Sequence, residues 1–187
     1  MKLADVVEQM KTVMMDGAKP LETRFEECLV AMADFLRLGI GRTGDRSTGA
    51  VLMVERVGES RHLAFAYPPH LASGNYVPVS GDSVAGRVVE SRSSVIANNL
   101  KEESHQGIFE LIPDTSGEVR PIQKMIASPM LDGQGEVFAV IEVNRTGTTP
   151  SDAGADFNPQ DVSNLELCCK AFAPYVHKIW TAVQAQS

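Results

Sequence analysis

Residues 122–145, IQKMIASPMLDGQGEVFAVIEVNR, decide the fold of this chain. Two apolar runs, at residues 123–131 and 136–144, flank the four turn-forming residues DGQG. Apolar runs of this length around a glycine-containing turn are typical of an antiparallel β-hairpin. Because apolar side chains fall on both faces of both runs, we expect helices or loops to cover both faces of the sheet.

Shorter strand-like runs on the N-terminal side predict the rest of the sheet. They lie at residues 50–57, 62–67, 76–79 and 94–98. Pro78 fits only an edge strand, because proline has no N–H to contribute to the ladder. A small helix at about residues 82–91 separates the last two runs, with Val84 and Val88 on its inner side. The sequence therefore predicts an α+β fold with an antiparallel sheet of five or six strands.

The start of the last helix is strongly marked. Asn158 is a good N-cap, Pro159 fits the first helical position, and Asp161 lies where the helix dipole favours an acid. Phe157 and Val162 are spaced as a hydrophobic staple across this start. The pattern predicts a helix from residue 159 almost to the end of the chain.

Two more amphipathic helices are predicted at residues 2–16 and from about residue 21. We expect residues 1–18 to be an N-terminal helical extension and residues 19–187 to be one domain that includes the long C-terminal helix. The terminal helices are expected on one face of the sheet. The small helix and the segment 101–120 are expected to cover a pocket on the other face.

An apolar stripe with alternating spacings of three and four follows the last helix. It consists of Val162, Leu165, Cys169, Phe172, Val176, Ile179 and Val183. At ~1.5 Å per residue the helix is about 42 Å long, which exceeds the width of a small domain. We therefore expect a homodimer through the terminal helices. The alternative is a helix that lies wholly on its own domain.

The composition excludes several classes of protein. The 187 residues are 43% hydrophobic and 22% charged, as in ordinary globular proteins, and no apolar stretch approaches the length of a membrane span. The net charge is −7 and no basic stripe occurs, so we expect no nucleic-acid partner. Three cysteines without a disulfide spacing, and no signal-peptide pattern, predict reduced thiols in the cytoplasm.

The order of these elements over about residues 20–180 resembles a GAF domain. The segment GDSVAGRVVESRSSVIANNL, at residues 81–100, resembles the small helix and following strand of that family, and residues 122–145 resemble its hairpin. Asn144 and Arg145, followed by Phe157 and Asp161, resemble the Asn-Lys…Phe-x3-Asp-Glu motif of GAF domains that bind cyclic nucleotides. Arg145 replaces the lysine and Val162 replaces the final glutamate, so a cyclic nucleotide is not indicated. Helix capping alone explains Phe157 and Asp161, and Arg145 can pair with Asp161 and so hold the connector before the last helix in place.

The resemblance implies a cytoplasmic sensory domain that binds a small molecule and signals through a helical homodimer to a separate partner. It leaves the ligand or cofactor open, because GAF domains bind cyclic nucleotides, tetrapyrroles, haem, amino acids or nothing known. The alternatives are a ligand-free dimeric interaction scaffold and, less favoured, a GAF-fold enzyme.

Polar residues that interrupt apolar runs are the expected ligand-binding groups. They are Asn98, Asn99, His105, Ser128 and Glu142, with walls from Val84, Val88, Phe109 and Met125. The alternative for each polar residue is that it satisfies loop backbone or faces solvent. No histidine has metal-ligand spacing, so no metal site is expected.

The sequence offers no obvious catalytic group. No base lies beside Ser83 or Ser128, and adjacent Cys168 and Cys169 diverge by about 100° on a helix. A GAF-fold enzyme that reduces free methionine sulfoxide needs several cysteines at the pocket, and a thioether-linked tetrapyrrole needs at least one. No cysteine occurs between residues 29 and 167. The expectation from the sequence is therefore that the chain is not an enzyme.

Overall fold

The computed structural model describes residues 2–40, 47–57, 60–72, 76–79, 83–100, 102 and 121–186. In this part of the chain the strands form one sheet, and helices cover both of its faces. The helices are α1 (Leu3–Met15), α2 (Leu21–Gly39), α3 (Pro69–Ala72), α4 (Val84–Ser91) and α5 (Pro159–Gln184). The strands are β1 (Ser47–Val57), β2 (Ser60–Tyr67), β3 (Tyr76–Pro78), β4 (Val95–Ala97), β5 (Ile122–Leu131) and β6 (Val137–Thr146).

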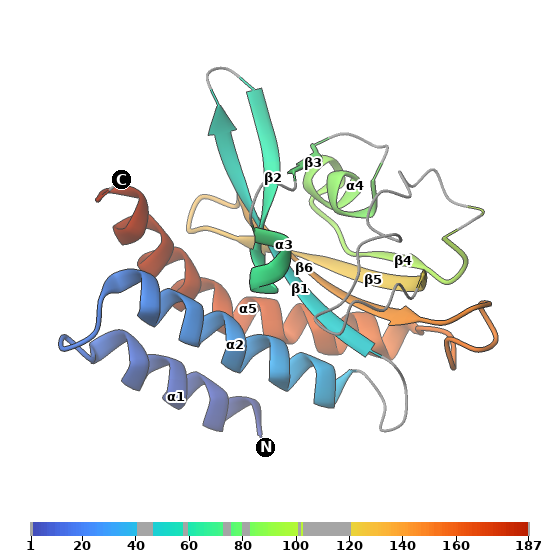
Figure 1. Cartoon of the computed structure of the whole chain (residues 1–187), viewed down its shortest axis with the longest axis horizontal. Coiled ribbons are helices and arrows are strands. Elements are labelled where there is room, and N and C mark those ends of the chain that lie inside the picture. The colour runs from blue at the N-terminus through green and yellow to red at the C-terminus, as the bar shows by residue number, and fades with distance from the viewer. Residues whose placement is uncertain are drawn as a thin grey trace.

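The six strands form one sheet in the order β3-β2-β1-β6-β5-β4, and every pair of neighbours is antiparallel. This confirms the predicted α+β fold. Helices α1, α2 and α5 lie together on one face, and α4 lies on the other (Figure 1). The short helix α3 was not predicted.

The β5–β6 hairpin forms where the sequence placed it. The carboxylate of Asp132 accepts hydrogen bonds from the backbone N–H groups of Gln134 (2.8 Å) and Glu136 (2.9 Å). Gly135 has φ +82°, a conformation that favours glycine. These local interactions fix the turn and with it the pairing of the two central strands.

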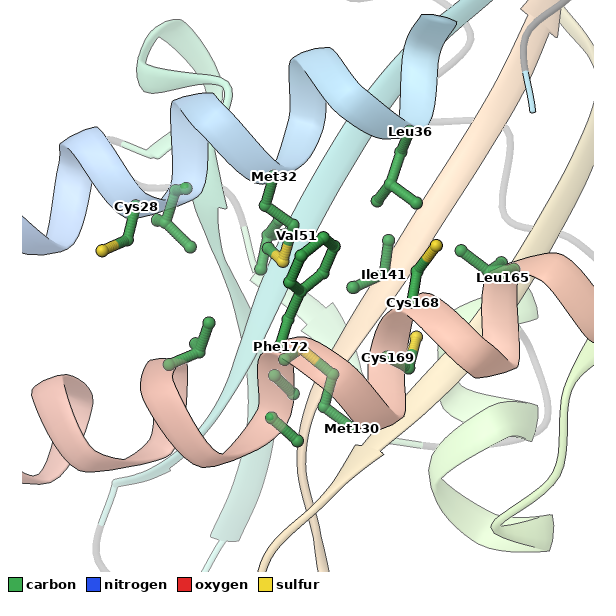
Figure 2. Close-up of a cluster of buried hydrophobic side chains, with 14 of the residues drawn as sticks. Cys28, Met32, Leu36, Val51, Met130, Ile141, Leu165, Cys168, Cys169 and Phe172 are labelled. Atoms are coloured by element: carbon green, nitrogen blue, oxygen red, sulfur yellow. The ribbon is translucent and has the colours of Figure 1, made fainter. Parts of the chain in front are cut away.

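The larger apolar core lies between the sheet and helices α1, α2 and α5. Phe172 points from α5 into this core toward Met32 of α2, and Val51 and Ile141 of the sheet lie beneath it (Figure 2). A second core lies under α4 and includes Val84, Val88, Leu52, Leu63 and Met125. The sheet is therefore buried on both faces, as the apolar pattern of its central strands predicted.

The apolar stripe of α5 is covered by its own chain. Val176 and Ile179 are 0% and 3% exposed, and they share the larger core with Val6 and Met10 of α1, which are both 0% exposed. Trp180 stacks on Phe25 of α2 with ring centroids 5.4 Å apart. The structure therefore shows the alternative in which the helix lies on its own domain, and the length of α5 no longer calls for a second copy.

The predicted start of α5 is confirmed. The side-chain oxygen of Asn158 accepts hydrogen bonds from the N–H groups of Gln160 (2.8 Å) and Asp161 (3.2 Å). The carboxylate of Asp161 accepts one from the N–H of Asn158 at 2.9 Å, which completes a capping box. Among the residues described, no helix is long and apolar enough to cross a membrane.

Candidate functional site

The most unusual side chain on the α4 face of the sheet is Glu142. In the β-sheet register Glu142 lies directly opposite Ala50 of β1 and Ala127 of β5. Directly opposed residues project to the same face, and both alanines belong to the core under α4. Glu142 is only 6% exposed, so a carboxyl group is buried in the middle of an apolar face between two small side chains.

The Glu142 carboxylate makes no hydrogen bond or ion pair with any residue in the described part of the chain. Burial raises its pKa to about 7 from the ordinary value of 4.5, and burial is the only cause. The group therefore changes its protonation state near neutral pH. A buried acid of this kind is a recognised feature of functional sites.

Asn99, which follows β4 in the sequence, carries a second polar group without a partner among the described residues. Its side-chain oxygen is buried without a hydrogen-bond partner in the described part of the chain. An unsatisfied buried acceptor costs free energy unless another molecule supplies a donor.

The expected pocket walls lie at the same face. Val84 and Val88 of α4 are 0% exposed, Met125 of β5 is 2% exposed, and all three share one core. Helix α4 is fixed at its start by Ser83, whose side-chain oxygen accepts a hydrogen bond from the N–H of Gly86 at 2.9 Å. The structure thus brings Val84, Val88, Met125 and Glu142 together.

Ser128 and Asn98 are placed elsewhere. Ser128 lies opposite Ile141, a member of the core on the helix side, and its hydroxyl is 2.9 Å from the hydroxyl of Ser94. The Asn98 side chain donates to the carbonyl of Phe157 (3.0 Å) and accepts from its N–H (2.8 Å). These two residues therefore do not meet Glu142. His105 and Phe109 lie outside the described residues.

Two buried basic side chains hold the connector between β6 and α5. The sequence had suggested this role for Arg145, through a pair with Asp161, but not for Lys124. Lys124 donates to the carbonyl of Gly154 (2.6 Å) and to the carboxylate of Asp156 (2.7 Å). Arg145 donates to the carbonyl of Ala155, and its guanidinium lies 4.0 Å from the centre of the Phe157 ring. Arg145 is fully buried and serves this connector, while Asp161 caps its helix. A basic residue within each of these two largely buried strands was the signal for this arrangement.

A hollow lies on the helix side of the sheet edge. It is a groove of about 590 Å³ between the end of β5, residues 92–94 and α5. Two of its lining residues, Ser94 and Glu166, are joined by a hydrogen bond of 2.7 Å, and its α5 side carries the small side chains Cys169 and Ala173. The groove takes in Ser128 but none of the other expected site residues.

The three cysteines all lie in the core on the helix side (Figure 2). Burial raises the pKa of the Cys28 and Cys168 thiols to about 11 and that of Cys169 to about 12. The thiolate, which is the reactive form, is therefore strongly disfavoured at neutral pH. Among the described residues no group of three histidines, cysteines or acids is arranged to hold a metal ion.

Comparison with known proteins identifies the fold. No family model and no curated protein matches the sequence. Among solved structures, the chain is similar to the GAF domain of a phosphoenolpyruvate-protein phosphotransferase from Coxiella burnetii, with 10% identity, TM-score 0.66, and coverage of 97% of this chain and 96% of that one. The corresponding domain from Acinetobacter is 11% identical, with TM-score 0.61 and coverage of 96% and 92%. The chain therefore has the GAF fold.

One further similarity corrects an expectation. The type II free methionine-R-sulfoxide reductase of Thermoplasma acidophilum is 17% identical, with TM-score 0.59, and the match covers 86% of this chain and 97% of that one. The same fold thus occurs in enzymes. The expectation that the chain is not an enzyme conflicts with this finding and is wrong as drawn, because a sequence without a recognisable nucleophile and base does not exclude catalysis on this fold.

Proposed function

We propose that this chain is a regulatory domain that binds a small molecule on the α4 face of its sheet, around Glu142. The observation that carries the proposal is the unpaired, buried carboxyl group of Glu142 between Ala50 and Ala127. A carboxyl group in this position weakens the fold, because burial without a partner costs free energy. Such a cost is common where a group is kept for binding.

A ligand bound on this face would affect the start of α5 through the residues that follow β4. Ala97 of β4 belongs to the core under α4, and the next residue, Asn98, holds both backbone hydrogen-bonding groups of Phe157. Phe157 immediately precedes the N-cap residue Asn158. A ligand that favours one position of residues 98 and 99 would therefore change the position or stability of the first turn of α5. Through α5 the domain would signal to a separate partner.

A homodimer remains part of the proposal, with a different surface from the one expected. The stacking of Phe25 on Trp180 and the contact of Phe35 with Phe172 show that α2 and α5 run antiparallel. Leu38 of α2 and Leu167 of α5 then lie near the same end of this helix pair, and they are 63% and 59% exposed. We propose that these outer side chains, and not the buried stripe of α5, contact the second copy.

A cytoplasmic location also belongs to the proposal. All three cysteines are free, buried thiols. Persistent free thiols are typical of a reducing compartment.

Thermal-shift and calorimetric screening of the full chain tests the binding proposal. The panel should contain amines, amino acids, organic acids, nucleotides and haem, applied to the wild type, Glu142→Gln and the control Glu166→Gln, which changes an exposed acid on the other side of the sheet. A ligand that stabilises the wild type and the control but not Glu142→Gln supports the proposal. The absence of any stabilising compound favours an interaction scaffold and overturns it.

The same screen should include free methionine-R-sulfoxide with a dithiol reductant, because reductases of this substrate share the fold. Formation of methionine would assign catalysis to the domain and replace the purely regulatory proposal.

A further inference from the structure

We propose that the groove between α5 and the end of β5 is a second binding site, and that its ligand is a neutral carboxamide with a compact apolar body. The groove lies on the helix side of the sheet, whereas Glu142 faces α4. This site is therefore independent of the one in the proposed function.

The groove has the size of a small-molecule site. Its volume is about 590 Å³, within the range of about 300–1,000 Å³ that is usual for ligand pockets. Its small or apolar lining side chains are Pro129 and Leu131 of β5 and Cys169, Ala173 and Pro174 of α5. Apolar groups on both sides of the hollow call for a ligand whose body is apolar.

Pro174 leaves an open acceptor on the α5 side of the groove. It lies in the interior of the helix and has no N–H, so the carbonyl of Lys170, four residues earlier, lacks its helical donor. No side chain in the described part of the chain donates to this carbonyl. Lys170 and Pro174 both line the groove. A ligand N–H in the groove would supply the hydrogen bond that the helix cannot make.

Several other polar groups of the groove already have partners. The guanidinium of Arg92 binds both carboxylate oxygens of Glu136, at 2.7 Å and 2.9 Å. The hydroxyl of Ser94 donates to the carboxylate of Glu166 at 2.7 Å and lies 2.9 Å from the hydroxyl of Ser128. These groups therefore stabilise the walls of the groove through contacts within the domain.

Asp132 and His177 are also engaged within the domain. Backbone hydrogen bonds from Glu136 and Gln134 lower the pKa of Asp132, with a smaller contribution from His177, so its carboxylate is ionised at neutral pH and holds the β5–β6 turn. The His177 ring lies against the Phe138 ring, with centroids 4.7 Å apart.

The charges of the groove favour a ligand without net charge. With histidine counted as neutral, the acids Asp132 and Glu166 balance the bases Arg92 and Lys170. A cationic ligand beside Lys170 would meet its ammonium group. An anionic ligand there would meet the carboxylate of Glu166, which lies one helical turn away.

Lys170 presents two open groups of opposite kind. Its side chain is exposed, and its ammonium group forms no ion pair or hydrogen bond with any residue that the structure describes. The ammonium group requires an acceptor, and the carbonyl requires a donor. A carboxamide supplies both, the acceptor through its oxygen and the donor through its N–H, and carries no charge.

A matched set of compounds with the same ring tests the ligand class on the full chain. Benzamide is compared with N,N-dimethylbenzamide, which has no N–H, with the anion benzoate and with the cation benzamidinium. The readouts are the carbon-13 signal of the Lys170 carbonyl and the dissociation constant from NMR titration of the groove residues.

Pro174→Ala is the test variant, because alanine gives α5 the N–H that occupies the Lys170 carbonyl and also favours the helix. Pro129→Ala is the control, because it removes a proline ring from the β5 side and leaves this carbonyl open. The thermal midpoint of each variant verifies that it is folded.

Benzamide is expected to shift the Lys170 carbonyl signal in wild type and in Pro129→Ala. It should bind Pro174→Ala about threefold to tenfold more weakly, as should N,N-dimethylbenzamide the wild type, because one hydrogen bond is lost. Tighter binding of benzoate or benzamidinium than of benzamide would overturn the ligand class. Equal binding of benzamide to Pro174→Ala and wild type, an equal loss in both variants, or no change of any groove signal would overturn the site. None of these outcomes involves Glu142, so the proposal for the α4 face is decided separately.

Discussion

The side-chain amide of Asn98 makes two hydrogen bonds to the backbone of Phe157, donating to its carbonyl at 3.0 Å and accepting from its N–H at 2.8 Å. The two residues are far apart in sequence but join the end of β4 to the residue before the α5 N-cap. A single side chain thereby links the edge of the sheet to the start of the longest helix.

Asn98→Ala should loosen the start of α5. The substitution leaves both backbone groups of Phe157 without their partner, which costs about 1–3 kcal/mol. Hydrogen exchange of the amides of Phe157, Gln160 and Asp161 should become faster, while amides in the centre of β6 stay protected. Asn164→Ala is the control, because Asn164 is exposed and contacts only the side chain of Gln160 in the described structure. Unchanged exchange in Asn98→Ala would show that this pair does not hold the helix.

Met10→Ala should destabilise the domain, because Met10 of α1 is 0% exposed in the core that covers α5. The expected loss in free energy of unfolding is about 2–5 kcal/mol, measured by urea denaturation. Met15 is 82% exposed, so Met15→Ala should change stability by less than about 0.5 kcal/mol. Equal effects of the two substitutions would contradict the packing of α1 on its own chain.

The stability of the domain should fall as pH rises from about 4.5 to about 7. In this range the folded state keeps the proton of Glu142, whose pKa is raised to about 7, whereas the unfolded chain has lost it. Because the folded state binds more protons, its stability decreases with pH across this window and levels off above it. Glu142→Gln should lack this decrease and should be more stable than the wild type by about 1–4 kcal/mol near pH 8. Parallel stability curves for the two proteins would show that Glu142 is not buried without a partner.

All three cysteines should react slowly with alkylating reagents in the folded protein. The thiols are buried, and burial holds their pKa values at about 11 to about 12. Mass spectrometry after treatment with iodoacetamide should find little modification until the chain is unfolded in urea. Rapid alkylation of Cys169 in the folded state would instead reveal an accessible thiolate.

Leu167→Glu should reduce self-association if the outer surface of α2 and α5 forms the proposed dimer interface. Leu167 is 59% exposed, so a charge at this position is tolerated in the monomer and disfavoured at an apolar interface. Analytical ultracentrifugation should show a dimer for the wild type and a monomer for the variant. Monomeric wild type, or a variant that dimerises equally well, would contradict the proposed surface.

The elements of this fold could be predicted because their signals are local. The turn around Asp132 and the capping box of Asn158 and Asp161 are fixed by neighbours within a few residues, and both appear as expected. The cover of α5 could not be predicted in the same way. The apolar side chains of α1 could cover α5 of the same chain or α5 of a second copy. Only the path of the chain between the two helices decides which of these occurs.

The sequence also does not predict to which face of the sheet each residue of the central strands projects. Both faces of β5 are apolar, and irregular pairing interrupts its register with β6 near Ile122 and Met130. Simple alternation therefore does not show that Glu142 faces α4 while Ser128 faces α5. The expected site residues divide accordingly between the α4 face and the helix side of the sheet.

Titration of the Glu142 carboxyl by carbon-13 NMR, with and without a bound ligand, tests the central claim most directly. The account predicts a midpoint near pH 7 in the free protein and a large shift when a ligand from the screen is added. A midpoint near the ordinary value of 4.5, unaffected by any compound that binds the protein, would place recognition elsewhere and contradict the claim.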